Sequence, residues 1–121
     1  MGKALETVNR FYDLTNNKKT EGLIELITED VTFVGPLIRT SGASEYIQLN
    51  EQFLTFHKNT HILKQFENGD DVCSIYELEA NTPAGGTISL LIADWIRVSK
   101  GRISEQRIYY DPREFAKAFG M

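Results

Sequence analysis

The chain has 121 residues, a formal net charge of −4 and an isoelectric point near 5.2. This length suits one core, so we expect residues 1–121 to form a single domain. The lysines are scattered, which argues against a nucleic-acid partner. One cysteine cannot close an internal disulfide, and the N-terminus lacks the apolar stretch of a secretory signal. We therefore expect a cytoplasmic protein that does not engage a membrane.

The first half of the chain has the apolar spacing of helices. Apolar side chains recur three and four residues apart over 3–16, until a run of asparagines and lysines ends the pattern. A β-branched and aromatic stretch then halts at Gly35-Pro36, as a short strand does before a loop. We predict helices over 3–16, from Thr20 to before Glu29, and from Gly42 to about 57–59, with a strand at 31–34.

From residue 61 the apolar period changes to that of strands, and turn residues separate the runs. We predict strands near 61–67, 71–81, 86–99 and 102–110. Three helices followed by an antiparallel meander predict an α+β domain whose helices cover one face of a curled sheet. A cavity between helices and sheet suits a small molecule. The tail from Pro112 should form a helix that closes this cavity or packs on a neighbouring subunit.

A single acid interrupts the most apolar strand of the chain. Counting outward from Asp94 at the strand period of two, its face carries only apolar neighbours, namely Leu90, Ile92, Ile96 and Val98. Burying an unpaired carboxylate costs several kcal/mol or more. Asp94 is therefore either a hydrogen-bonded structural group or part of a ligand site with a raised pKa.

The order of these elements, together with ITEDVTFVGP (27–36) and the closing stretch from ADWIRV (93–98) to RIYYD (107–111), resembles the nuclear transport factor 2-like superfamily. The nearest relatives would be SnoaL-like polyketide cyclases, ketosteroid isomerases and limonene epoxide hydrolases. The resemblance implies a cone-shaped α+β barrel, with three N-terminal helices packed on a curled, mostly antiparallel sheet. Members of this superfamily differ in chemistry, so the fold leaves the reaction open.

The isomerase pattern maps only partly onto this sequence. The oxyanion acid falls on Asp94, which implies a protonated carboxyl able to donate a hydrogen bond. The general base position is Gly35, and the helix tyrosine aligns on Phe11. Tyr12, the next residue, could substitute if the helix is rotated.

The epoxide hydrolase pattern is broken as well. Its acid and arginine positions fall on Ile108 and Ile75, and only the carboxylate of Glu77 survives. The resemblance points Glu77 inward, where it would be the one candidate base. Alternation alone cannot assign the inner face of this strand, and glutamates are rarely buried, which favours a solvated Glu77 on the outer face.

These observations predict a pocket for a small apolar molecule, with no metal and no organic cofactor. If the protein is catalytic, Asp94, Glu77 and Tyr12 would transfer protons on a carbonyl-bearing substrate. The expected substrate-binding residues are Phe53, His57, Ile75, Ile92, Ile96, Gln106, Ile108 and Tyr110. The alternative is a non-catalytic binding or dimerisation module of the same fold.

Two further patterns bear on partners. His57 and His61 have the spacing of a helical metal pair, although no third ligand is near, and His57 could instead cap a helix end or line the pocket. The family resemblance implies that Leu91, Trp95 and Tyr109 lie on the sheet face away from the helices. An apolar outer face needs a cover, so we expect a homodimer through it.

Overall fold

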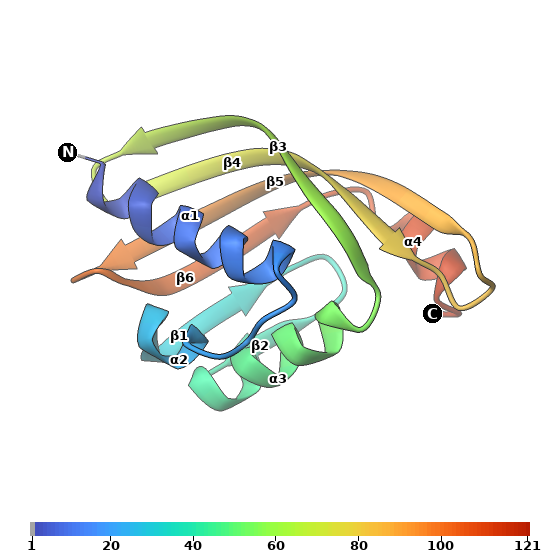
Figure 1. The fold of residues 1–121 in the computed structure, drawn as a ribbon, viewed down its shortest axis with the longest axis horizontal. Helices are drawn as coiled ribbons and strands as arrows, with labels where there is room; N and C mark the ends of the chain where they lie inside the picture. Colours follow the sequence, from blue (N-terminus) through green and yellow to red (C-terminus); the bar gives the residue numbers. More distant parts are fainter. Residues whose placement is uncertain (1) are drawn as a thin grey trace.

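The computed structural model describes residues 2–121 as one curled sheet with helices on its concave side (Figure 1). The six strands lie in the order β2-β1-β6-β5-β4-β3, and every described pair except β1–β6 is antiparallel. The α+β architecture predicted from the sequence is thereby confirmed. In chain order the elements are α1 (Lys3–Asn16), α2 (Leu23–Leu26), β1 (Ile27–Val34), β2 (Arg39–Ser41), α3 (Ala43–Leu54), β3 (His57–Asn68), β4 (Asp71–Asn81), β5 (Thr87–Ser99), β6 (Arg102–Tyr109) and α4 (Arg113–Ala118).

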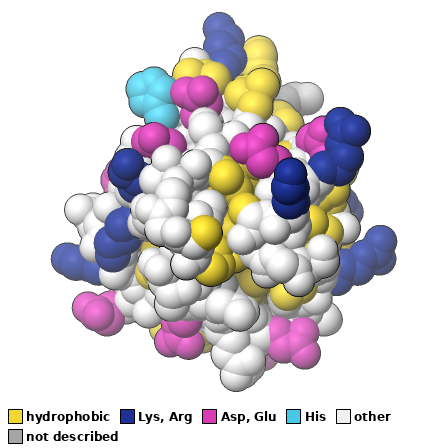
Figure 2. Space-filling model, turned by 90° about the vertical axis from the view of Figure 1, so that its right-hand side faces the viewer, with side chains coloured by type: hydrophobic (Ala, Val, Ile, Leu, Met, Phe, Trp, Pro, Cys, Tyr) yellow, Lys and Arg dark blue, Asp and Glu magenta, His cyan; other side chains and the backbone are white. Residues whose placement is uncertain are grey.

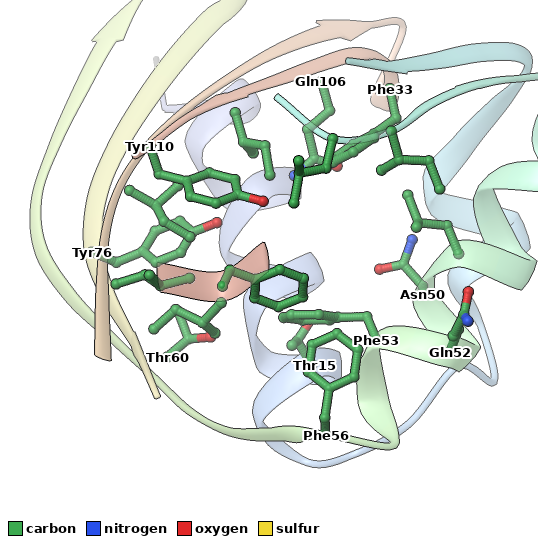
Figure 3. Close-up of a pocket in the computed structure, with 18 of the residues that line it drawn as sticks. Thr15, Phe33, Asn50, Gln52, Phe53, Phe56, Thr60, Tyr76, Gln106 and Tyr110 are labelled. Atoms are coloured by element: carbon green, nitrogen blue, oxygen red, sulfur yellow. The ribbon is translucent and has the colours of Figure 1, made fainter. Parts of the chain in front are cut away.

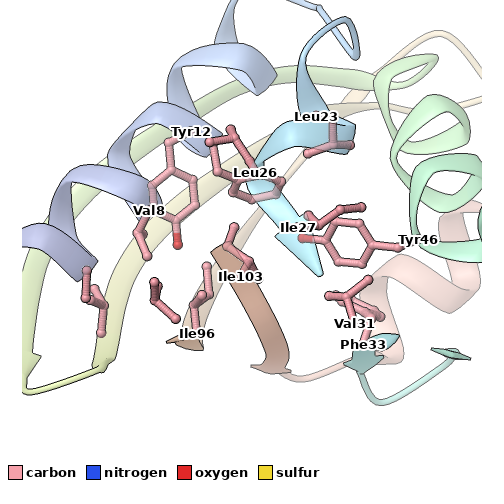
Figure 4. Packing of buried hydrophobic residues seen from close by; sticks show 14 of the residues in the cluster. Val8, Tyr12, Leu23, Leu26, Ile27, Val31, Phe33, Tyr46, Ile96 and Ile103 are labelled. Atoms are coloured by element: carbon pink, nitrogen blue, oxygen red, sulfur yellow. The ribbon is translucent and has the colours of Figure 1, made fainter. Parts of the chain in front are cut away.

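Helix α1 lies across the concave side of the sheet, because one of its faces is apolar. Its buried side chains follow helical spacing and include Val8, Phe11 and Tyr12. Figure 4 shows Tyr12 from α1 and Tyr46 from α3 packing over the sheet among aliphatic side chains such as Ile27 and Ile103. The core therefore fills one end of the concave side, beneath α1 and α2.

Strand β5 shows how the two faces of the sheet differ. Leu90, Ile92, Asp94, Ile96 and Val98 are all buried, as their shared face predicts. The alternate positions are open, since Leu91 and Trp95 are 64% and 39% exposed. The concave face thus carries core and cavity, and the convex face carries the apolar residues expected there.

Two strands begin earlier than the sequence predicts, and one strand was not predicted. Strand β1 begins at Ile27 rather than residue 31, because Ile27 pairs with Ile103 of β6 before an irregularity in the register. The edge strand β2 has three residues, too few to show an alternating pattern. Strand β3 begins at His57, where the prediction still had helix, because its mostly polar first residues pair with β4.

The C-terminal tail forms the short helix α4 at the far end of the sheet (Figure 1). None of the side chains of α4 is fully buried. Its ring-bearing residues pack on α3's C-terminal end, since Phe115 and Phe119 lie 5.7 and 4.9 Å from the ring centroid of Phe56. Within residues 2–121, no helix is both long and apolar enough to cross a membrane.

Candidate functional site

A cavity of about 410 Å³ lies between the helices and the concave face of the sheet. Its wall combines side chains from distant parts of the chain, among them Phe53 of α3, Ile92 of β5 and Ile108 of β6. Figure 3 shows ring-bearing and amide side chains pointing into this space from several elements. Folded cores leave few voids larger than a water molecule, so a space of this size is not a packing accident.

The mouth of the cavity lies at the α4 end of the molecule. Phe115, Phe119 and Met121 of the tail line it together with Phe56. The face that turns this end to the viewer shows apolar side chains at its centre, with charged groups around them (Figure 2). The tail thus contributes to the cavity mouth, one of the two arrangements that the sequence left open.

Asp94 lies directly beneath the cavity and is completely buried. Its Oδ2 accepts hydrogen bonds from the hydroxyls of Tyr12 and Tyr76, at 2.9 and 3.0 Å. The amide Nε2 of Gln106 donates to both carboxylate oxygens, at 3.1 and 3.0 Å. Tyr12, Tyr76 and Gln106 line the cavity, so these three side chains separate Asp94 from it.

A second hydrogen bond fixes the amide of Gln106. The buried hydroxyl of Tyr46 donates to Gln106 Oε1 at 2.5 Å, which leaves Nε2 facing the carboxylate. The reverse orientation of the amide would place its oxygen against Asp94 and is unfavourable. We call Asp94, Tyr12, Tyr46, Tyr76 and Gln106 the Asp94 cluster.

Burial dominates the ionisation of this cluster. It raises the pKa of Asp94 from 3.8 to about 6, although the hydrogen bonds from Tyr12, Gln106 and Tyr76 act in the opposite direction. Burial and the Asp94 charge together raise the pKa of Tyr12 and Tyr76 well above 10. At neutral pH the carboxyl is therefore mostly ionised, and the two tyrosines keep their protons.

The charge of Asp94 has no cationic partner. The ion pairs in the described part of the chain join Arg97 to Asp71, Arg107 to Glu105 and Arg113 to Asp111, all with solvent-accessible side chains. The carboxylate is held by neutral donors alone. If this position served only the stability of the fold, an apolar residue would avoid the free-energy cost of burying a carboxylate.

Side chains that could act as strong acids or bases do not line the cavity. Among residues 2–121, the polar lining consists of hydroxyls and amides, and it includes no Asp, Glu, His, Lys, Arg or Cys. Within the same residues no cluster of three side chains is suited to hold a metal ion.

Most of the predicted site residues meet at this cavity. Tyr12, Phe53, Ile92, Gln106, Ile108 and Tyr110 line it. Ile96 and Asp94 lie on the same face of β5 but are buried beneath the lining. His57 is also buried and packs its ring on Phe53, with centroids 5.1 Å apart.

Two predicted site residues point the other way. Glu77 is exposed and Ile75 is half-buried on the convex face, and neither lines the cavity. The inward orientation that the family resemblance implied for them is therefore wrong. The reason is the period of a strand, because Tyr76 and Leu78 occupy the inward positions of β4.

Gly35 occupies the position where the resemblance places an isomerase base. A Cβ atom there would lie 3.1 Å from Ile108 Cγ1 and 3.4 Å from Phe33 Cε2. A side chain at this position would thus press on the apolar wall of the cavity. Because Ile108 occupies the space next to Gly35, an acidic side chain could not be placed at residue 35 without moving Ile108.

His57 and His61 do not form a helical pair. His57 and His61 both lie on β3, where His57 is buried and His61 is exposed. His57 instead belongs to a polar group that we call the Lys18 clasp, made of Lys18, His57, Thr60 and Asn16. Lys18 Nζ contacts His57 Nδ1 and donates to the carbonyls of His57 and Lys58, at 2.8 and 3.0 Å.

The rest of the clasp ties the end of α1 to β3. His57 Nε2 and Thr60 Oγ1 lie 2.8 Å apart, and the amide of Asn16 bonds the backbone N–H and carbonyl of Thr60. Because Lys18 donates to Nδ1, the neutral ring carries its hydrogen on Nε2. Burial, and after it the charge of Lys18, lower the pKa of His57 to about 4.

Neither Tyr46 nor Tyr76 was among the site residues predicted from the sequence. A signal was available, since both tyrosines lie on apolar faces where a hydroxyl needs a partner. Asp94 and Gln106 supply those partners from two other strands.

Comparison with known proteins places the chain in a wide structural group. Residues 8–106 match the family model of the SnoaL-like domain. An NTF2-like protein of unknown function from Cytophaga hutchinsonii is 26% identical, with a TM-score of 0.81 over 93% of each chain. No curated protein matches the sequence.

Two further solved structures share the fold at lower identity. An NTF2-like protein of unknown function from Burkholderia pseudomallei is 16% identical over the whole of both chains, with a TM-score of 0.87. A protein described as a SnoaL-like polyketide cyclase, from Jannaschia sp. CCS1, is also 16% identical. It covers 97% of this chain and 91% of its own, with a TM-score of 0.84. Identities this low show the fold alone.

Proposed function

The chain belongs to the SnoaL-like domain family, and on that premise we propose that it binds one small, mostly apolar molecule in the cavity. The observation that carries this proposal is the cavity of about 410 Å³, mostly apolar on its walls and bounded by the Asp94 cluster on one side. Sites for small ligands combine these features, with apolar surface for affinity and a few polar groups for orientation.

A direct test uses a ligand that needs only the apolar walls. We expect 2-methoxynaphthalene to bind the wild-type protein, measured by ligand-observed NMR. Ile108→Trp should abolish binding, because the larger ring fills the cavity that Ile108 lines. Ile24→Trp is the matched control, since Ile24 is 54% exposed on α2 and does not line the cavity. Equal binding by both variants would contradict a ligand site in the cavity.

We propose cofactor-independent proton transfer on an apolar carbonyl compound as a second candidate function. The Asp94 carboxyl favours it, because a pKa of about 6 lets this group hold a proton in mildly acidic solution. A protonated Asp94 would donate to Tyr12 or Tyr76, whose own hydroxyl hydrogen would then face a substrate carbonyl. Asp94 would act as a positioning residue, and Glu77, on the convex face, has no part in the reaction.

The reaction class can be tested with 3-cyclohexen-1-one. Isomerisation forms the conjugated ketone, which absorbs in the ultraviolet. Because no carboxylate or imidazole of the described residues lines the cavity, water would accept the proton from the α carbon and would return one to the γ carbon. We expect the rate to fall as the pH rises through about 6, and to be lost in Asp94→Asn. A rate of conversion that is independent of pH and unchanged in Asp94→Asn would exclude this role of Asp94.

We also propose that a second copy of the chain covers the convex face. The cytoplasmic location is a separate matter and stays a prediction from the sequence. Leu91, Phe66, Trp95 and Tyr109 are exposed there. A specific dimer interface buries about 1,200–2,000 Å² in total. Light scattering at micromolar concentration should give the mass of a dimer for the wild type and that of a monomer for Leu91→Glu. A wild-type monomer would contradict this proposal.

A further inference from the structure

The hydroxyl hydrogens of Tyr12 and Tyr76 point to Asp94 and not into the cavity. A phenol has one hydrogen to donate, and Tyr12 and Tyr76 both donate theirs to Asp94 Oδ2. What these two hydroxyls can offer to a ligand is oxygen lone pairs. We call the oxygens of Tyr12 and Tyr76 the tyrosine floor.

The direction of these hydrogen bonds is fixed by the surrounding residues. Gln106 cannot reverse its amide, because Oε1 is held by the buried hydroxyl of Tyr46. Asp94 has no cation nearby among the described residues, so it depends on the donors that point at it. A tyrosine that turned its hydrogen toward the cavity would leave a completely buried carboxylate with one donor fewer.

We propose that the tyrosine floor recognises a hydroxyl group, so that the ligand is an apolar ring molecule whose phenolic or alcoholic O–H donates to Tyr12 and Tyr76. This inference rests on the proposed binding function and names its ligand class. While Asp94 is ionised, a ketone or an ether of the same shape presents only lone pairs to the floor and finds no donor there.

The other polar side chains that point into the cavity are less selective. The side chains of Asn50 and Tyr110 both point into the cavity (Figure 3). Asn50 Nδ2 donates to the carbonyl of Tyr46 at 2.9 Å, which leaves its carbonyl oxygen and one N–H for a ligand. The Tyr110 hydroxyl can donate or accept. These groups tolerate either polarity, so discrimination falls to the tyrosine floor.

A matched pair of probes separates this inference from the cavity itself. 2-Naphthol and 2-methoxynaphthalene differ by one methyl group on the oxygen, which removes the donor and keeps the ring. The readout is the dissociation constant of the ether divided by that of the naphthol, measured by ligand-observed NMR at pH 8. A ratio within one variant is insensitive to the fraction of folded protein.

We expect Tyr76→Phe to lower this ratio about three- to tenfold, because one acceptor of the floor is lost. Tyr109→Phe should keep the wild-type ratio, since Tyr109 is 54% exposed and does not line the cavity. In Asp94→Leu the tyrosine hydrogens lose their acceptor and can turn to the ligand, so the ratio should fall at least as far. In Asp94→Asn it should fall less, because the amide oxygen can still accept them.

Each result has a defined meaning. If the ether binds the wild type, and the ratios in Tyr76→Phe and in Asp94→Leu both equal the wild-type ratio, the inference is overturned and the proposed binding function stands. If neither probe binds the wild type, the binding function fails, and the inference that rests on it fails too. If Tyr76→Phe does not fold, as judged by circular dichroism, the ratio in Asp94→Leu decides.

Discussion

Two polar groups hold α1 against the sheet, and they are built on opposite principles. The Asp94 cluster surrounds an anion with neutral donors, whereas the Lys18 clasp places a cation against a neutral ring and backbone carbonyls. The clasp satisfies carbonyl groups at a chain junction, which any fold requires. The Asp94 cluster satisfies no backbone group, and three of its members line the cavity. This difference indicates that the Lys18 clasp serves the fold, whereas the Asp94 cluster serves the proposed ligand site.

The largest expected effect comes from removing both hydroxyls of the tyrosine floor. Tyr12→Phe with Tyr76→Phe leaves Asp94 with Gln106 as its remaining donor. Breaking a buried charged network by removing partners costs about 3–5 kcal/mol, and we expect a loss of this size in urea denaturation at pH 8. The loss should shrink at pH 5, because Asp94 takes up a proton below about pH 6. Equal losses at the two pH values would mean that the carboxylate is not what the tyrosines stabilise.

Asp94→Asn should have a smaller effect in the opposite direction. The pKa of Asp94 rises from 3.8 to about 6 on folding, so its contribution to stability is complete below pH 3.8 and is lost as the pH rises through about 6. This difference corresponds to about 3 kcal/mol. At pH 8 we expect the variant to be as stable as the wild type or more stable, with the advantage lost near pH 4. A large fall in the melting temperature of Asp94→Asn at pH 8 would mean that Asp94 is a structural residue.

His57 should give a pH dependence of the opposite sign. Its pKa falls from 6.5 to about 4 on folding, so its stabilising contribution is present above pH 6.5 and is lost as the pH falls toward 4. Between pH 7 and pH 5, His57→Gln should lose about 1–2 kcal/mol less stability than the wild type. The expected value is discounted because the ring lies close to solvent-exposed Lys18, where its charge is partly screened. Urea denaturation checks this, with His61→Gln as the exposed control. An unchanged pH profile in His57→Gln would show that the ring is not the titrating group.

The contrast between the two groups also marks how far sequence reasoning reached. Asp94 stood out because it is the one acid on an apolar strip, a pattern readable along a single strand. Its partners Tyr12, Tyr76 and Gln106 come from three other elements, and only their meeting in space gives them a role. The order of the elements was predictable because periodicity and turn residues are local properties.

The errors have local causes as well. Glu77 and Tyr76 are neighbours on one strand, and a shift of one residue exchanges the inward and outward faces. The Lys18 clasp could not be predicted, because β3 begins among polar residues that give no strand signal. Its members lie 39 and 44 residues apart in the chain, for the Lys18–His57 and Asn16–Thr60 contacts.

The smallest expected effect separates charge from burial within the clasp. Lys18→Met removes the cation beside His57 but leaves the ring buried, so the pKa of His57 should rise only part of the way from about 4 toward 6.5, because burial is the larger cause of the shift. Stability should fall by about 1 kcal/mol or less, since the Lys58 carbonyl lies at the surface and the contact to the His57 carbonyl is only partly buried, so water can replace the ammonium group. NMR titration of the ring measures the pKa, and Lys19→Met, an exposed neighbour, is the control. A full return to 6.5 would mean that the cation alone keeps His57 neutral, and that the clasp is an electrostatic pair rather than a buried junction.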